Sequence, residues 1–107
     1  MRNYILDENK KPIPEDDIPT WGKWFEEDTS RGRVALDIIQ ETHVKVSTVF
    51  LGLDHSFGSG DPILWETMIF GGVNDGYQDR YSSHEDAVRG HAKALEIAKS
   101  NIEYKDS

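Results

Sequence analysis

Four polar residues in the second half of the chain have side chains that could take part in chemistry: Asp54, His55, Glu66 and His91. Imidazole and carboxylate groups are ligands of zinc, manganese and iron, so these residues could form a divalent metal site. Their spacing matches no helical metal signature such as HExxH. The alternative is a buried network in which Glu66 accepts a hydrogen bond from His91 or from backbone amides. Buried polar groups usually find such partners, which favours the network, with no bound metal, no cofactor and no catalytic residue.

Two further features could contact phosphate or nucleic acid. Gly58-Ser59-Gly60 could surround a phosphate with backbone amides. However, no Gly-Lys-Ser/Thr follows it, and it precedes a predicted strand rather than a helix, so the known phosphate-loop contexts fail. A connection between two strands is therefore favoured. The indoles of Trp21, Trp24 and Trp65 could stack on bases, but the acidic charge balance favours packing inside the protein instead.

These candidates would be positioned by an antiparallel sheet. Two β-rich runs, Arg33–Gln40 and His43–Leu53, are separated by Glu41-Thr42, which has the length of a tight hairpin loop. Two further strands are predicted at Ile63–Phe70 and Gln78–Tyr81. The second run becomes apolar on both faces toward its end. It should therefore be a central strand whose C-terminal half is covered on both sides.

A helix over residues 83–102 is the most regular element in the sequence. Its apolar side chains recur at helical spacing along one face, and His91 lies within this stripe. We therefore expect His91 to face the sheet. Ser82 or Ser83 can cap the start of the helix, and a glycine at position 90, inside it, indicates close packing.

The N-terminal part has a less regular pattern. Residues 1–20 are predicted to form an irregular arm, with room for a short strand at Asn3–Leu6. Prolines interrupt helices and strand pairing, and this arm contains three of them, Pro12, Pro14 and Pro19. A short helix follows at Trp21–Asp28, with Thr20 as its cap.

These elements predict an α+β fold in a single domain, residues 1–107. A sheet of three or four antiparallel strands carries the C-terminal helix on one face. The N-terminal arm and short helix should cover an edge or the other face. Residues 103–107 should fray as a tail.

The charge balance excludes several functional classes. The chain has 12 basic and 20 acidic residues and a net charge of −8, so it lacks the basic stripe of a nucleic-acid binder and would be repelled by an anionic membrane.

The chain contains no cysteine, which excludes disulfides and thiolate metal sites and fits a reducing cytoplasm. We find no secretory signal at the N-terminus and no apolar stretch of about 18 residues that could span a membrane.

The N-terminal third holds the most acidic part of the chain, in two separate runs: Glu15-Asp16-Asp17 and Glu26-Glu27-Asp28. These six carboxylates are a candidate binding surface for a basic partner. The alternative is a solvated surface that keeps a small domain soluble.

Several segments resemble a family of small phage and prophage proteins. The resemblance spans about residues 31–95. It rests on Ser47-Thr48-Val49-Phe50-Leu51-Gly52-Leu53-Asp54-His55, Phe57-Gly58, Glu66-Thr67-Met68-Ile69-Phe70-Gly71-Gly72, Arg80-Tyr81-Ser82-Ser83 and Gly90-His91. The resemblance implies a viral or prophage origin, and hence the cytoplasm of a bacterial host. It implies no biochemical activity and no catalytic residues.

Together these observations favour an interaction protein rather than an enzyme. The expected partner is a host protein with a basic surface, such as a defence or nucleic-acid-handling protein, whose nucleic-acid groove the acidic surface would occupy. Direct binding to nucleic acid or membranes is not expected, and self-association stays open. The alternative function is a small-ligand or metal-binding protein or enzyme built around His55, Glu66 and His91.

Overall fold

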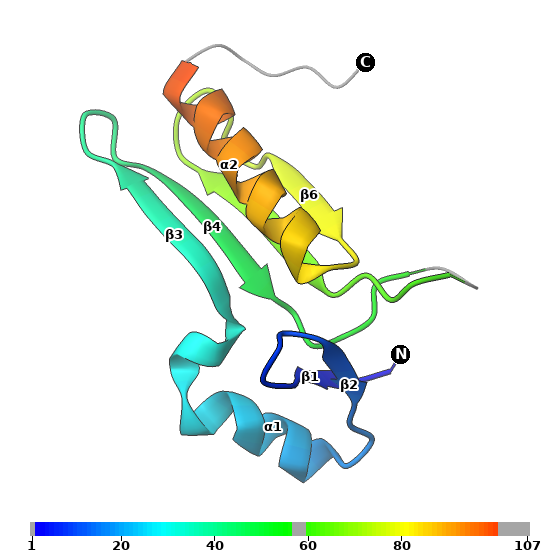
Figure 1. The fold of residues 1–107 in the computed structure, drawn as a ribbon. Helices are drawn as coiled ribbons and strands as arrows, with labels where there is room; N and C mark the ends of the chain where they lie inside the picture. Colours follow the sequence, from blue (N-terminus) through cyan, green and yellow to red (C-terminus); the bar gives the residue numbers. More distant parts are fainter. Residues whose placement is uncertain (1, 57–59, 101–107) are drawn as a thin grey trace.

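A four-stranded antiparallel sheet with a long helix across one face forms the body of the protein in a computed structural model, which describes residues 2–56 and 60–100 (Figure 1). The strands follow chain order across the sheet: β3 (Arg33–Ile39), β4 (Val44–Phe50), β5 (Trp65–Phe70) and β6 (Gln78–Tyr81). Helix α2 (His84–Ser100) packs on them. The predicted α+β fold is confirmed. Within the two described ranges, no helix has the length and hydropathy needed to cross a bilayer.

The β3–β4 hairpin forms as predicted, with a turn that includes residues on both sides of Glu41-Thr42. The N–H groups of Thr42 and His43 both donate to the carbonyl of Ile39. His43 has a φ of 58°, so it supplies the left-handed conformation that glycine usually provides in such turns. His43 therefore lets the turn close without a glycine.

Helix α2 begins where its capping pattern predicts. The Ser83 hydroxyl accepts a hydrogen bond from the N–H of Asp86, and the Ser83 carbonyl accepts from Ala87. The expectation that glycine at position 90 marks close packing is also confirmed. A Cβ at Gly90 would overlap the ring of Tyr81, so only glycine lets α2 lie this close to β6.

The N-terminal segment is more regular than the prediction of an irregular arm over residues 1–20. β1 (Tyr4–Leu6), close to the short strand predicted at Asn3–Leu6, pairs with β2 (Pro12–Pro14) in a two-stranded antiparallel sheet. The prediction underestimated β2 because proline cannot donate to a ladder. Proline is nevertheless accepted on an edge strand, and β2 has a partner on one side only.

Helix α1 (Ile18–Glu27) starts earlier than the predicted Trp21–Asp28. Asp17, not Thr20, is its cap: the Asp17 carboxylate accepts from the Thr20 N–H. Pro19 lies in the first helical turn, where no N–H partner is required, so it does not block the helix. A 3₁₀ turn, η1 (Thr29–Gly32), follows, and its Arg31 donates to the carbonyl of Trp24 at 2.8 Å.

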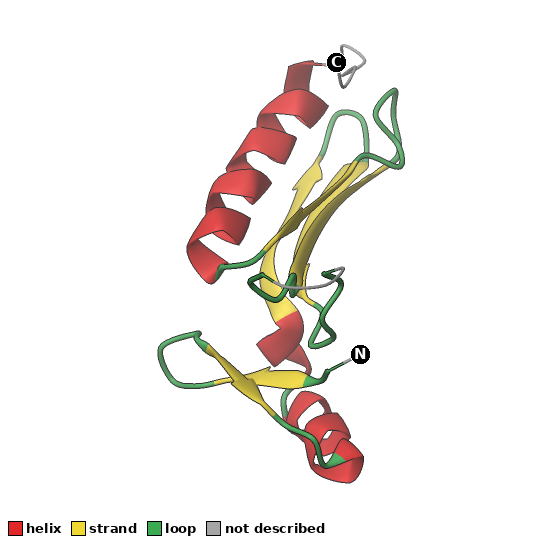
Figure 2. Cartoon of the chain, turned by 90° about the vertical axis from the view of Figure 1, so that its right-hand side faces the viewer, coloured by secondary structure: helices red, strands yellow, loops and turns green. Residues whose placement is uncertain are grey.

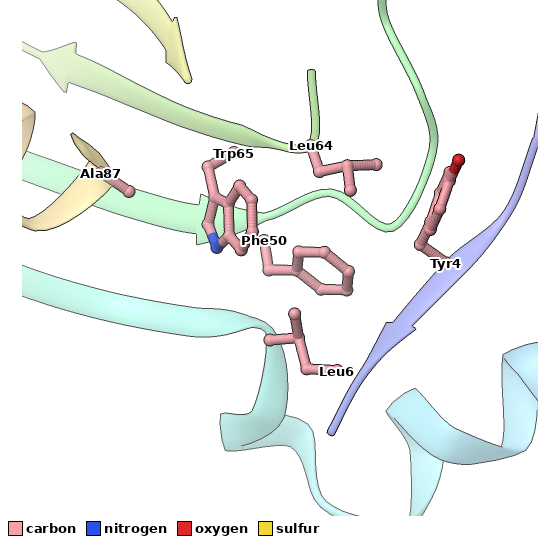
Figure 3. Close-up of a cluster of buried hydrophobic side chains, with 6 residues drawn as sticks. All are labelled: Tyr4, Leu6, Phe50, Leu64, Trp65 and Ala87. Atoms are coloured by element: carbon pink, nitrogen blue, oxygen red, sulfur yellow. The ribbon is translucent and has the colours of Figure 1, made fainter. Parts of the chain in front are cut away.

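Within residues 2–56 and 60–100, the hydrophobic core has two parts. One lies between the sheet and the far half of α2, with Val46, Ile69 and Ala94 all 0 % exposed. The other joins the sheet to the N-terminal elements and contains Tyr4, Leu6, Phe50, Leu64, Trp65 and Ala87 (Figure 3). From α1, the rings of Trp24 and Phe25 pack on Phe50 at centroid distances of 5.9 and 6.0 Å.

The N-terminal elements extend the sheet at one end and leave its second face open. Asn3 bridges to Leu53, and Tyr4 N–H donates to the carbonyl of Gly52. This attachment places β1, β2 and α1 beyond the end of β4 (Figures 1 and 2). On the face opposite α2, Leu36, Ile38 and Phe70 are 40–52 % exposed. The prediction that the second strand is central is confirmed, but α2 covers only one of the two faces of the sheet.

Candidate functional site

His91 joins helix α2 to two strands, and the prediction that it faces the sheet is confirmed. It is 6 % exposed. Its Nε2 lies 2.7 Å from Oδ2 of Asp37 on β3, and its Nδ1 lies 2.7 Å from Oγ1 of Thr48 on β4. Thr48 Oγ1 is in turn 2.5 Å from Oγ1 of Thr67 on β5. Both threonines are 0 % exposed. The network therefore spans three strands, buried at His91 and the two threonines and open to solvent at Asp37.

The hydrogen-bond pattern follows from the chemistry of the groups. In the neutral imidazole, Nε2 donates to the Asp37 carboxylate and Nδ1 accepts from the Thr48 hydroxyl. A carboxylate, an imidazole and a hydroxyl in this order also form the catalytic triad of hydrolases. Here the hydroxyl of Thr48 is buried beneath α2, where no substrate can reach it. The arrangement therefore connects elements and does not supply a nucleophile.

Glu66 belongs to the opposite face of the sheet. Its neighbour Thr67 points to the His91 network, and side chains alternate along a strand. Glu66 Oε2 accepts from Arg80 Nε at 2.9 Å and also from Gln78 Nε2. Its side chain is 12 % exposed, so the pairing compensates for partial burial. Glu66 is therefore paired, but by β6 and not by His91.

Asp54 and His55 lie beyond the end of β4, near the N-terminal hairpin. Asp54 Oδ1 accepts from the N–H groups of Ser56 and Ile63, at 2.8 and 3.0 Å. These hydrogen bonds, the one from Ser56 first, hold the pKa of Asp54 below its ordinary value. The His55 N–H donates to the carbonyl of Ile63. Asp54 thus organises its own loop, at a different place from Glu66 and His91.

The four candidate polar residues do not come together as one site. Within residues 2–56 and 60–100, no group of three or more His, Asp or Glu side chains lies close enough to hold a metal ion. The suggested phosphate loop, Gly58-Ser59-Gly60, falls largely outside the described residues. Sequence reasoning missed Asp37 and Thr48, the partners of His91. The one available signal was Asp37 itself, the charged residue among the apolar residues that follow Arg33 in the strand Arg33–Ile39.

The six acidic candidates gather at the two ends of helix α1. Asp16, Asp17, Glu26, Glu27 and Asp28 are exposed and Glu15 is half-buried. A ten-residue helix is about 15 Å long, which sets the separation of the two runs. Residues 15–31 carry six acids and two bases, a net charge of −4. Half of the chain's net charge of −8 therefore lies on this one segment.

Three of the six carboxylates accept hydrogen bonds from backbone N–H groups. Glu15 accepts from the N–H of Asp17 at 3.1 Å. Asp17 caps α1, and the Asp28 carboxylate accepts from the backbone N–H and the hydroxyl of Ser30. The side-chain and backbone hydrogen bonds from Ser30 lower the pKa of Asp28, and Lys10 makes the smallest contribution to that shift. Glu27 lies 3.5 Å from Arg31 and 4.0 Å from Lys23. Glu26 is involved in none of these contacts, so the surface combines structural and free carboxylates.

An open groove of about 330 Å³ lies along α1, beside strand β1. Its walls are Ile5 and Trp24, with Thr20, Lys23 and Glu27 at its polar positions. An apolar wall with a carboxylate near it suits a long cationic side chain, whose stem needs apolar contact and whose head needs a charge partner. We call this feature the α1 groove.

No family model, no curated protein and no solved structure matches the chain.

Proposed function

We propose that the protein acts by binding a protein partner with a basic surface, through helix α1 and its flanking carboxylates. The observation that carries this proposal is that half of the net negative charge lies on α1 and its ends, beside the α1 groove. Complementary charge steers association and selects partners. The described polar side chains form no accessible catalytic arrangement, which favours binding over catalysis.

The outer surface of α2 provides a useful contrast. There Glu85, Asp86 and Glu96 are interspersed with Arg89, Lys93 and Lys99, and Asp86 pairs with Arg89. Opposite charges so close together cancel beyond a Debye length of about 8–10 Å. The segment around α1 lacks this balance, so it dominates the field that an approaching basic partner meets.

The partner class follows from the charge and from the resemblance to phage and prophage proteins. A defence or nucleic-acid-handling protein of a bacterial host has a basic groove for nucleic acid. Carboxylates about 15 Å apart at the ends of a rigid helix could occupy such a groove in place of phosphates. The protein would then act in the host cytoplasm, as an inhibitor that competes with nucleic acid.

Binding of a fluorescent arginine-rich peptide, measured by anisotropy over a salt series, tests the charge and the groove together. We expect Glu26→Gln/Glu27→Gln to weaken binding by a factor of about 1.4 to 5 per carboxylate, since exposed ion pairs contribute about 0.2–1 kcal/mol. The salt dependence should become shallower, because fewer ion pairs form. These two positions leave the caps Asp17 and Asp28 intact.

The matched control is Glu85→Gln/Glu96→Gln on α2, which changes the net charge equally. It should retain the affinity of the parent protein. Equal weakening by both pairs would mean that only overall charge matters and would overturn the proposal. A peptide affinity unchanged by the α1 pair would overturn it as well.

A further inference from the structure

The sheet face opposite α2 is covered by no described element and carries apolar side chains (Figure 2). Leu36, Ile38 and Phe70 lie on it and are 40, 52 and 40 % exposed. They share this face because Leu36 pairs with Ser47, while Ile38 and Phe70 both pair with Lys45. Apolar side chains gathered on one exposed face are typical of an interaction surface.

The same face is basic, although the protein as a whole is acidic. The strands place three bases on it, Arg33, Lys45 and Arg80, and one acid, Glu66, which Arg80 already pairs. Its net charge is therefore +2 within a chain of −8. Neither Arg33 nor Lys45 lies within 4 Å of a carboxylate among the described residues. We call this surface the open sheet face, formed by Arg33, Leu36, Ile38, Lys45, Glu66, Phe70 and Arg80.

Helix α1 has the opposite charge and also lacks full cover. None of its ten residues, all of them described, is buried, and Ile18 at its start is 58 % exposed. Its two acidic runs are about 15 Å apart. Arg33 pairs with Val49, which is four residues from Lys45 along β4, or about 13 Å. The two unpaired bases of the open sheet face thus have nearly the spacing of the two acidic runs.

Within one chain, α1 is held away from the open sheet face. The Trp21 indole donates to the carbonyl of Tyr4 at 3.0 Å, and Trp24 and Phe25 pack on Phe50 at the end of β4. These contacts fix the helix beyond the end of the sheet (Figure 1). A second copy has no such restriction. A helix about 15 Å long and 10 Å wide fits on strands of seven residues, which are about 23 Å long.

We propose that the open sheet face binds helix α1 of a second copy of this chain. The acidic runs of one copy would meet Arg33 and Lys45 of the other, and the helix would cover the apolar side chains between them. Complementary charge favours this pairing. Two open sheet faces would instead repel each other, because both are basic. The inference goes beyond the proposed partner binding, since it assigns another surface and a different occupant.

Sedimentation velocity of the intact chain at about 1 μM to 1 mM, which covers weak to moderate affinities, tests the contact. We expect the average mass to rise with concentration. Two charge reversals, Arg33→Glu/Lys45→Glu on the face and Asp16→Lys/Glu26→Lys on the helix, should each weaken self-association about tenfold or more, since like charges then meet. The helix variant leaves the caps Asp17 and Asp28 intact.

Mixing the two variants gives the sharpest readout. An equimolar mixture should associate again, because the acidic face of one variant meets the basic helix of the other. Both variants remain net negative, since two reversals change the parent's charge of −8 by only four units. Overall charge therefore cannot draw them together, and restored association would also show that both variants are folded.

The matched control is Lys11→Glu/Lys99→Glu, which changes the charge equally on the side of α2. Lys11 lies near the start of that helix and Lys99 in its last turn. This variant should keep the parent's self-association to within about twofold. Equal weakening by the control and the face variant would mean that only overall charge matters and would overturn the proposal.

Three other outcomes would overturn it as well. The first is a parent chain that stays monomeric at every concentration. The second is loss of association in the face variant but not in the helix variant, which would indicate contact between two sheet faces. The third is a mixture that does not associate. None of these outcomes decides the arginine-peptide test of α1, which needs only the monomer.

Discussion

The carboxylate of Asp37 lies 2.7 Å from Nε2 of His91, although 54 positions separate the two residues in the chain. Asp37 is on the edge strand β3 with a half-exposed side chain, whereas the His91 side chain is 7 % exposed beneath α2. The contact fixes α2 against β3, one of the two edge strands that the helix contacts. A charged side chain on the covered side of an edge strand also discourages pairing with another chain.

The first prediction concerns the stability that this network contributes. His91→Ala should lower the free energy of unfolding by about 1–3 kcal/mol, because it removes packing and leaves the buried Thr48 hydroxyl without the imidazole. Asp37→Asn should cost less, because the amide oxygen still accepts from Nε2. Urea unfolding followed by tryptophan fluorescence gives both values.

A double-mutant cycle separates the network from simple loss of volume. Thr48→Val keeps the shape of the side chain and removes the hydroxyl. If the hydrogen bond contributes, Thr48→Val/His91→Ala should cost less than the sum of the single changes, by about 0.5 kcal/mol or more. Strict additivity would show that the hydrogen bond between Thr48 and His91 adds nothing to stability.

The second prediction uses two helical glycines with different surroundings. Gly90→Ala should destabilise the protein by about 1–3 kcal/mol, because the new Cβ would overlap the Tyr81 ring. Gly22→Ala in α1 should instead stabilise it by up to about 1 kcal/mol, since nothing lies within 4 Å of an added Cβ and alanine favours helix. Thermal unfolding of the two variants measures both effects. Equal shifts in the same direction would contradict this account of the α2–β6 contact.

Elements defined by local pattern were predictable from the sequence. Four features depend only on residues that are close together in the chain. They are the alternation in β4, the exact bounds of β6, the Ser83 cap and the apolar stripe of α2. The burial of His91 followed from its place in that stripe. The meaning of Gly90 also followed, because a glycine inside a strong helix needs a packing reason.

Features defined by distant contacts were not predictable. Which residues meet His91 depends on which face of the sheet α2 covers and on how it crosses that face. The helix lies on the face of Asp37 and Thr48, whereas Glu66 points to the other face. The pairing of β2 depends on β1 approaching it from the side where the prolines need no N–H.

The third prediction distinguishes structural from free carboxylates around α1. Asp17→Ala should destabilise the protein by about 0.5–2 kcal/mol, because it removes the acceptor for the Thr20 N–H. Asp16→Ala removes an exposed carboxylate that lies 3.7 Å from Arg2 and should cost less than about 0.5 kcal/mol. Chemical unfolding of both variants checks the difference. Equal costs would mean that Asp17 is not the cap.

The last prediction concerns acid unfolding and Asp54. Hydrogen bonds from the N–H groups of Ser56 and Ile63 lower its pKa below the ordinary value of 3.8. A lowered pKa means that the ionised carboxylate stabilises the fold above pH 3.8, and that this contribution is lost as the pH falls through the lowered pKa. Asp54→Asn cannot titrate, so its free energy of unfolding should decline less steeply with falling pH in that window than the parent's. Urea unfolding at a series of pH values from neutral into this window measures the two slopes.

The asparagine variant should be less stable than the parent at neutral pH, where the parent's carboxylate is ionised, and the two curves should converge in acid. Parallel curves would show that the loop draws no stability from the charge of Asp54.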